Sequence, residues 1–264
     1  MYANCPKCGH APLPTDQAAP AACPACGVIL AKFGTAPARA GARAAPAGRS
    51  TASQEFEEAP SLSARRAALL LYVPREVSAL YWKGRLGALA VFVLWTLLIF
   101  KNLDMAEGVG NGFLHLILIP FHEAGHVFLF WAPSILHYFG GALGQAAMPL
   151  ILAGSLLLKR RDPFGAALFT WLLGFSLIDT AIYMYDAYDP HLMLLTGHTG
   201  AESANHDWIQ VFGDLGLLNH ARGIGRACAA LGGAVMVAAL AWAGLLLWKQ
   251  RERLSENPLA EENL

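Results

Sequence analysis

Residues 112–132 read GFLHLILIPFHEAGHVFLFWA, and Glu123 is the only charged side chain among them. A helix needs about 20 apolar residues to cross the hydrocarbon core of a membrane, so this stretch is long enough to do so. Blocks of the same kind follow Arg85, at residues 86–100, 134–158, 163–185 and 227–248. The pattern predicts an all-α polytopic membrane protein.

The composition of the 264 residues agrees with this class of protein. Hydrophobic residues make up 55% of the chain and charged residues only 14%, whereas a soluble domain carries about 25% charged residues. Lys plus Arg equals Asp plus Glu at 19 each, which leaves no basic excess for binding nucleic acid. We therefore expect a lipid bilayer around the chain and no nucleic-acid partner.

Basic residues near the apolar blocks predict which ends face the cytoplasm. Three clusters lie before the first block, after the third and after the last (Arg65, Arg66, Arg75, Lys83 and Arg85; Lys159, Arg160 and Arg161; Lys249, Arg251 and Arg253). The positive-inside rule places all three in the cytoplasm, but five full crossings would put the last two on the opposite side. We therefore prefer four crossings plus a re-entrant hairpin at residues 134–158, with five crossings as the alternative. The residues that favour a hairpin there are Gly140, Gly141, Gly144 and Pro149.

The first 33 residues carry two Cys-x-x-Cys pairs, Cys5/Cys8 and Cys23/Cys26. Four thiolates at this spacing resemble a small zinc ribbon, in which one tetrahedral structural Zn²⁺ holds the chain together. So short a segment cannot build a core, and metal binding would supply most of its folding free energy. Disulfides or a redox-active pair are the alternative. Reduced thiolates agree with a cytoplasmic N-terminus.

Composition divides the chain into five segments. The zinc ribbon at 1–33 is followed by an Ala-, Pro- and Gly-rich stretch at 34–63, which predicts a flexible linker. Residues 64–85 mix basic and apolar side chains and predict an interfacial amphipathic segment broken near Pro74, or else more linker. The membrane domain spans 86–248, and 249–264 form a cytoplasmic tail. The ribbon is a candidate binding module for a cytoplasmic protein.

A second metal motif, His122-Glu-Ala-Gly-His126, lies inside the apolar stretch quoted first. Positions i and i+4 share one helix face, so both imidazoles can bind one Zn²⁺. Glu123 between them can act as a general base on a water activated by the metal. A carboxylate near mid-bilayer costs at least about 2.5–3.5 kcal/mol, so it is seldom placed there without a role. A polar helix contact without metal is the alternative. His115 falls on nearly the same face, as an outer partner of the site or as a satisfied buried histidine.

This motif, with the glycine-rich residues 139–145 (FGGALGQ) after it, resembles the site-2 protease family of intramembrane zinc metalloproteases. The resemblance covers roughly residues 110–190. It implies that His122 and His126 are zinc ligands and that Glu123 is the catalytic base. It also implies a re-entrant segment beside the active site that holds an extended substrate. The substrate-binding residues implied in this way are Gly140, Gly141, Gly144 and Gln145.

The third zinc ligand is the point where the chain departs from that family. The family takes it from an Asp-Gly motif in a later helix, and no Asp-Gly dipeptide occurs in this sequence. We favour Asp186 or His206 as the third ligand, with Asp179 next. Asp207 is a further candidate, or an outer partner of the site.

These observations together predict one catalytic and one structural Zn²⁺ in a multi-pass protein typical of a bacterial inner membrane, with its zinc ribbon in the cytoplasm. The expected activity is hydrolysis of a peptide bond in or next to the bilayer, in a membrane-protein or transmembrane-helix substrate. The missing Asp-Gly motif and the histidine-rich loop 186–226 leave a non-proteolytic zinc sensor or transporter-like protein as the alternative. A catalytically silent scaffold is a third hypothesis. A transporter would be expected to show an internal repeat, and we find none.

Overall fold

The computed structural model describes residues 4–5, 8–11, 13, 21–25, 29–30, 61–106, 112–195, 197–202 and 206–256. The chain divides into two compact units, Met1–Glu58 and Ala59–Leu264. Three predicted features lie wholly or largely outside the described residues: Cys26, the linker at 34–63, and the end of the tail.

The smaller unit gathers its few buried side chains around two cysteines. Cys5, Cys23 and Leu30 are all buried and pack against one another. An antiparallel bridge joins Ala22 to Ile29, and the Leu30 N–H donates to the Ala21 carbonyl at 2.9 Å. Residues 21–22 and 29–30 are therefore paired with each other, and Leu30 packs against Cys5 and Cys23.

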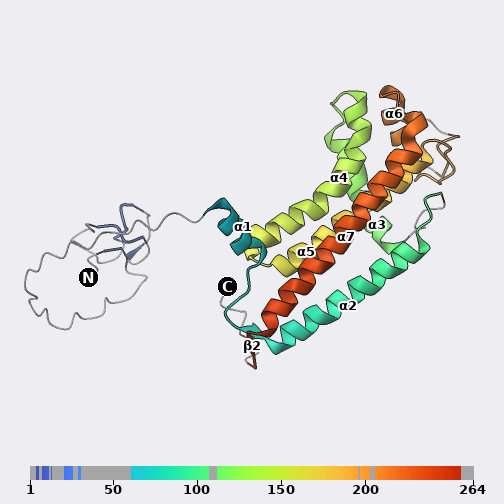
Figure 1. Cartoon of the computed structure of the whole chain (residues 1–264). Helices are drawn as coiled ribbons and strands as arrows, with labels where there is room; N and C mark the ends of the chain where they lie inside the picture. The colour runs from blue at the N-terminus through green and yellow to red at the C-terminus, as the bar shows by residue number, and fades with distance from the viewer. Residues whose placement is uncertain are drawn as a thin grey trace, which may run out of the picture. The chain divides into compact units, whose positions relative to one another are not determined.

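The larger unit is a bundle of helices (Figure 1). Its elements in chain order are α1 (Leu62–Leu70), β1 (Val77–Ser78), α2 (Ala79–Asn102), α3 (Phe113–Phe128), α4 (Ser134–Ser155) with the π-helical turn η2 (Leu156–Arg160), α5 (Pro163–Asp186), α6 (Asp207–Asp214), the 3-10 turn η3 (Leu218–His220), α7 (Ala221–Arg251) and β2 (Leu254–Ser255).

Four helices in the described part of the chain are long and apolar enough to cross a membrane: Ala79–Asn102, Ser134–Arg160, Pro163–Asp186 and Leu218–Arg251. The chain is therefore mostly helical and compatible with a multi-pass membrane protein, as the sequence predicts.

Helices α5 and α7 form the centre of the bundle. Their backbones touch where two glycines meet, because a Cβ at Gly232 would lie 2.5 Å from the Gly174 carbonyl oxygen. Trp171, Ile178 and Met236 are fully buried around this contact. The Trp171 indole N–H donates to the Thr96 hydroxyl at 2.7 Å and so ties α2 to the same core.

The three basic clusters that flank the apolar blocks lie at the same end of this bundle. The Arg85 guanidinium lies 3.5 Å from the Asp162 carboxylate and donates to the Gln250 side chain at 3.3 Å. These contacts join the start of α2, the turn between α4 and α5, and the end of α7. We call this the basic end, and the opposite end, where α5 ends and α7 begins, the far end.

The predicted re-entrant hairpin at residues 134–158 is wrong, because this segment is one continuous helix. The glycines serve close packing instead of a turn. A Cβ at Gly125 would lie 1.9 Å from the Gly140 carbonyl oxygen, and one at Gly144 would lie 2.3 Å from the Phe121 carbonyl oxygen. Small residues at such a contact let two helix backbones approach closely. Pro149 is accommodated within the helix.

The short element is α3, although its apolar block is long. The helix has 16 residues, which is about 24 Å and less than the hydrocarbon core of about 30 Å. It begins beside α2, where the exposed Phe113 ring stacks on Trp95 with a centroid separation of 6.4 Å. It ends at the turn before Pro133, because the chain has to reverse there to start α4. Conversely, α2 starts at Ala79 and is longer than the block 86–100 indicated.

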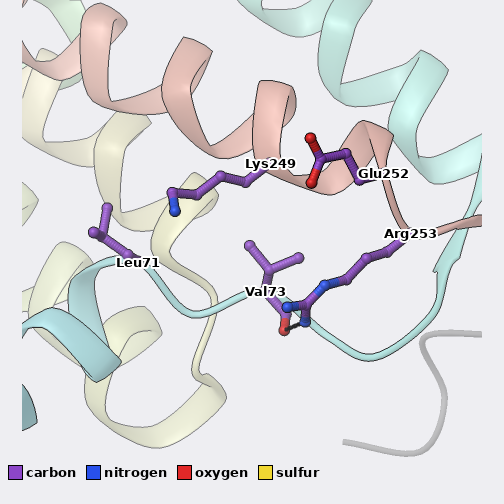
Figure 2. Close-up of a pocket in the computed structure, with 5 residues that line it drawn as sticks. All are labelled: Leu71, Val73, Lys249, Glu252 and Arg253. Atoms are coloured by element: carbon purple, nitrogen blue, oxygen red, sulfur yellow. Dashed lines mark hydrogen bonds between the residues drawn. The ribbon is translucent and has the colours of Figure 1, made fainter.

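The segment between the linker and α2 packs on the basic end. Helix α1 ends before Pro74, as predicted, and the Trp242 indole donates to the Leu70 carbonyl at 2.8 Å. Strand β1 pairs in parallel with β2, so the predicted tail is held by the bundle at its beginning. Figure 2 shows a pocket here, and its lining residues are Leu71, Val73, Lys249, Glu252 and Arg253. The Arg253 guanidinium donates to the Val73 carbonyl at 2.8 Å.

Candidate metal centres

Two histidines and one aspartate converge at the far end of the bundle. The Asp207 Oδ2 atom lies 3.0 Å from His122 Nε2 and 3.2 Å from His126 Nε2. The two imidazoles lie one helical turn apart on α3, and Asp207 is the first residue of α6. The three side chains form a group that could hold a metal ion.

The hydrogen bonds of the imidazoles determine which nitrogens face this group. His126 Nδ1 lies 2.8 Å from the His137 carbonyl oxygen, and His122 Nδ1 lies 3.1 Å from Gln145 Oε1. Both partners only accept, so both Nδ1 atoms carry the proton. A neutral imidazole then has its lone pair on Nε2. With neutral imidazoles, three acceptor atoms therefore point at one another, which is favourable only when a metal cation or an added proton lies between them.

The spacing of these atoms fits a tetrahedral metal. Zinc–nitrogen and zinc–oxygen bonds of about 2.0–2.2 Å place neighbouring ligand atoms about 3.3 Å apart. The two nitrogen–oxygen distances at Asp207, 3.0 and 3.2 Å, are close to that value. Two imidazoles with one carboxylate are also a ligand set that zinc accepts, with a fourth position left for water or substrate.

Gly141 on α4 keeps the space beside the ligand atoms open. A Cβ at this position would lie 2.4 Å from His122 Nε2 and 2.6 Å from His126 Nε2. Any side chain there would occupy the volume that a metal ion needs.

The substrate contacts implied for the glycine-rich segment do not fit this geometry. Gly140 and Gly144 pack on the backbone of α3, and their own peptide groups belong to a helix. A helical segment has no free peptide edge for pairing with an extended substrate. Gln145 is 3% exposed, and its amide is hydrogen-bonded within the protein. Gly140 and Gly144 instead bring α4 close to α3, and Gln145 is hydrogen-bonded to His122.

Asp186 and His206, the favoured third ligands, bind each other instead of the metal group. Their side chains are buried and lie 3.1 Å apart. The other Asp186 oxygen accepts the N–H groups of His191 and Leu192. The other His206 ring nitrogen accepts the Ile209 N–H and caps α6. Because each side chain uses both of its polar ends, neither has an atom left for a metal.

The Asp186–His206 pair helps to position Asp207, the candidate that the sequence analysis placed after Asp186, His206 and Asp179. Capping by His206 places the first turn of α6, and Asp207 is the next residue. The Asp207 backbone N–H donates to the Tyr183 hydroxyl at 3.2 Å, and the Tyr183 ring packs on His206 with a centroid separation of 4.2 Å. The His206-Asp207-Trp208 element was a visible signal, but which of its side chains faces α3 depends on this cap.

Electrostatics keep Asp207 suited to a cation. Burial by itself raises the pKa of the Asp207 carboxyl, but the contacts from His122 and His126 outweigh it and hold the pKa below its usual value. The group is therefore ionised at neutral pH. Asp179, another candidate ligand, lies outside this group and contacts His115 and Gln145.

Glu123 follows the first ligand directly on α3. Its side chain is exposed, and its charge is close enough to act on His126 and Tyr183. A carboxylate in that place can exchange protons with water beside the metal group.

The second candidate centre lies in the smaller unit. Cys5, Cys8 and Cys23 form a group that could hold a metal ion. The sulfurs of Cys8 and Cys23 are 3.7 Å apart, near the separation of about 3.8 Å that tetrahedral zinc–thiolate bonds imply and far beyond a disulfide bond of about 2.05 Å. Gly9, with φ of 75°, makes the tight turn after the first pair.

Comparisons with protein families, with curated proteins and with solved structures find no match for this chain. What the two centres do is therefore inferred from their own geometry and chemistry.

Proposed function

We propose that the helical unit is a membrane-embedded zinc protease that hydrolyses a peptide bond in or next to the bilayer. The observation that carries this proposal is the convergence of His122 Nε2, His126 Nε2 and Asp207 Oδ2 beside Gly141. The HEAGH motif on a single helix, with its resemblance to site-2 proteases, supports the same chemistry.

The residues of the chain have separate roles in this reaction. His122, His126 and Asp207 would hold zinc. When bound, the metal would supply Lewis acidity for polarising a carbonyl and activating water. The Glu123 carboxylate takes a proton from the attacking water and gives it to the leaving amine. Asp207 brings a negative charge in place of the aspartate of the missing Asp-Gly motif.

The basic end supports one orientation of the chain in the membrane. Four crossings by α2, α4, α5 and α7 put all three basic clusters on one side without any hairpin, and the positive-inside rule makes that side the cytoplasm. Gly141 lies 19 residues before Arg160, which is about 28 Å along α4. The metal centre then lies near the opposite, non-cytoplasmic face of a bacterial inner membrane, where membrane-protein segments would be cut.

The smaller unit is a zinc ribbon in this proposal. Cys26 completes the set begun by Cys5, Cys8 and Cys23, and the bound zinc supplies the folding free energy that a segment without a core lacks. A ribbon on the cytoplasmic side is placed to bind a cytoplasmic protein.

Metal counting on the purified full chain tests both centres. We expect two zinc ions in the natural protein. The Cys5→Ser/Cys8→Ser variant should lose one of them, and the His122→Gln/His126→Gln variant should lose the other. If the histidine variant keeps both ions, the metal centre at the far end is refuted, and the protease with it.

A Glu123→Gln variant separates a protease from a zinc sensor. It keeps all three ligands, so both zinc ions should remain, while one or more membrane proteins should accumulate uncut in quantitative proteomics of the membrane fraction. The matched control is Glu252→Gln, which removes an acid at the basic end of the bundle. Equal fragment patterns for Glu123→Gln and the natural protein would favour the sensor.

A further inference from the structure

A chain of partly buried hydrogen bonds runs from α3 through α5 and α4 and returns to α3 at His122. His115 Nδ1 lies 2.8 Å from Asp179 Oδ1. The Gln145 amide N–H donates to Asp179 Oδ2 at 2.9 Å. At its other end, Gln145 Oε1 lies 3.1 Å from His122 Nδ1. Neither His115 nor Asp179 belongs to the metal group itself.

The surroundings of Gln145 allow only one orientation of its amide. The Nε2 atom lies 3.2 Å from the Ser176 carbonyl oxygen and 2.9 Å from the Asp179 carboxylate. A carbonyl and an ionised carboxylate only accept hydrogen bonds. A flipped amide would place its oxygen against both of them, and the bond to a charged carboxylate is the stronger of the two that would be lost. The amide oxygen therefore faces His122.

The orientation of the amide in turn determines the tautomer of His122. An amide oxygen only accepts, so His122 Nδ1 must carry the proton and Nε2 must carry the lone pair. Nε2 is the atom that faces Asp207 at 3.0 Å. The opposite tautomer would turn an N–H toward the metal position and exclude a cation.

We infer that Asp179 is a positioning residue of the metal centre, which acts through Gln145 to hold His122 in its metal-binding tautomer. This inference rests on the proposed ligation of zinc by His122, His126 and Asp207. Outer partners of this kind orient metal ligands in many proteins. Here the hydrogen-bond partner of His122 is the neutral amide of Gln145. The charged group that orients this amide is Asp179, the next side chain in the hydrogen-bonded chain.

This role accounts for a carboxylate on α5 within an apolar span. Asp179 is 9% exposed at its side chain, and a charge there is costly unless it is paired. His115 occupies one of its oxygens and Gln145 the other. These two hydrogen bonds lower the cost of the Asp179 charge and also fix its carboxylate next to the Gln145 amide.

Asp179→Asn tests the inference in the full chain purified in detergent. An amide at position 179 can turn either its oxygen or its nitrogen toward Gln145, so only the Ser176 carbonyl, the weaker of the two acceptors, still favours one orientation of Gln145. In metal-free protein that also carries Asp207→Ala, so that no carboxylate competes for a proton on Nε2, ¹⁵N NMR of the histidine rings should show His122 as a mixture of tautomers instead of the Nδ1–H form alone. Zinc affinity at this centre, measured by chelator competition, should fall about 10- to 100-fold.

Exchanging the two groups provides a rescue that a merely structural role would not predict. In the Gln145→Glu/Asp179→Asn variant, the carboxylate at position 145 accepts from His122 whichever way it turns. The amide at position 179 donates to it and still accepts from His115. We expect the Nδ1–H tautomer to return and most of the lost affinity to be recovered.

Thr180→Val is the matched control, because Thr180 is buried beside Asp179 on α5 and takes no part in this chain of bonds. Its tautomer and affinity should equal those of the natural protein. The inference is overturned if Asp179→Asn leaves the tautomer unchanged. It is also overturned if the exchanged pair fails to recover the tautomer, or if Thr180→Val shifts it equally. If the natural protein binds no zinc here, the proposed function fails by that result alone, while the tautomer of the metal-free protein still decides the inference.

Discussion

In the described part of the bundle, two helix pairs touch at glycines, and only one of them adjoins the side-chain group that could hold a metal ion. In the α5–α7 pair, Gly174 and Gly232 meet inside an apolar core. In the α3–α4 pair, Gly125 and Gly140 meet just as closely, but Gly141 on the next position adjoins two imidazoles. The same close packing of glycines therefore forms part of the apolar core where the surrounding side chains are buried and apolar. It builds a site where one glycine leaves space unfilled.

The largest effect should come from filling that space. Gly141→Ala puts a methyl group within 2.6 Å of both Nε2 atoms, so we expect zinc binding at this centre to be lost while the helices remain folded. Metal counting and circular dichroism measure the two outcomes. Gly154→Ala on the same helix, where nothing lies within 4 Å, should keep the zinc. Full zinc occupancy in Gly141→Ala would mean that the ion does not sit beside α4.

Acidification should weaken the α3–α4 centre and leave the α5–α7 pair intact. Metal binding needs neutral imidazoles, whose usual pKa is about 6.5. The lowered pKa of Asp207 keeps its carboxylate ionised over this range, so only the histidines contribute. Two histidines with that usual pKa predict a fall in zinc affinity of about 30-fold between pH 6.5 and pH 5.5.

Chelator competition across that range, in a Cys5→Ser/Cys8→Ser background, measures the effect of pH on this centre alone. An affinity that stays flat down to pH 5.5 would contradict ligation by His122 and His126.

Overpacking the scaffold pair should affect stability and spare the metal. A Cβ at Gly232 would meet the Gly174 carbonyl oxygen at 2.5 Å and Ile178 at 2.9 Å. Gly232→Ala should lower the free energy of unfolding by about 3 kcal/mol, with zinc affinity changed less than about threefold in a folded sample. Thermal unfolding in mild detergent and metal counting test both parts. Gly223→Ala, with nothing within 4 Å, is the control and should not destabilise α7.

The smallest effect should come from the bond that attaches α2 to the scaffold pair. Thr96→Val keeps the shape of the side chain but leaves the buried Trp171 indole N–H without its acceptor. An unsatisfied buried donor of this kind lowers stability by about 1–2 kcal/mol. The same thermal measurement applies, with Thr170→Val as the matched change, since that hydroxyl bonds only within its own helix. A loss of zinc in Thr96→Val would show that the two pairs are not independent.

Several features of the fold could be predicted from the sequence because they depend on local composition. Apolar block lengths predicted a multi-pass helical protein, and the i, i+4 spacing of His122 and His126 predicted one shared face. The glycines of α4 were predicted to break the helix. Glycine lowers helix propensity wherever it occurs, and only the approach of α3 makes its missing side chain favourable for packing.

The third member of the candidate metal group could not be predicted for a related reason. Asp186, His206 and Asp207 are all polar residues near the end of α5, and nothing in their order along the chain separates a ligand from its support. The hydrogen bonds of Asp186 and His206 are completed by backbone N–H groups several residues away. Because Asp186 and His206 are bound in this way, Asp207 is the carboxylate that faces His122 and His126.

By itself, the sequence predicted helices long and apolar enough to cross a membrane and a pair of histidines on one helix face. Burial of apolar blocks in lipid and the spacing of donors on one helix are properties of short stretches of chain. Only the tertiary structure decided that α3 is the short element, that Asp207 joins the histidines, and that Asp179 is aimed at Gln145. These outcomes depend on which backbones can touch and which buried polar groups find partners, and both are settled between segments far apart in the chain.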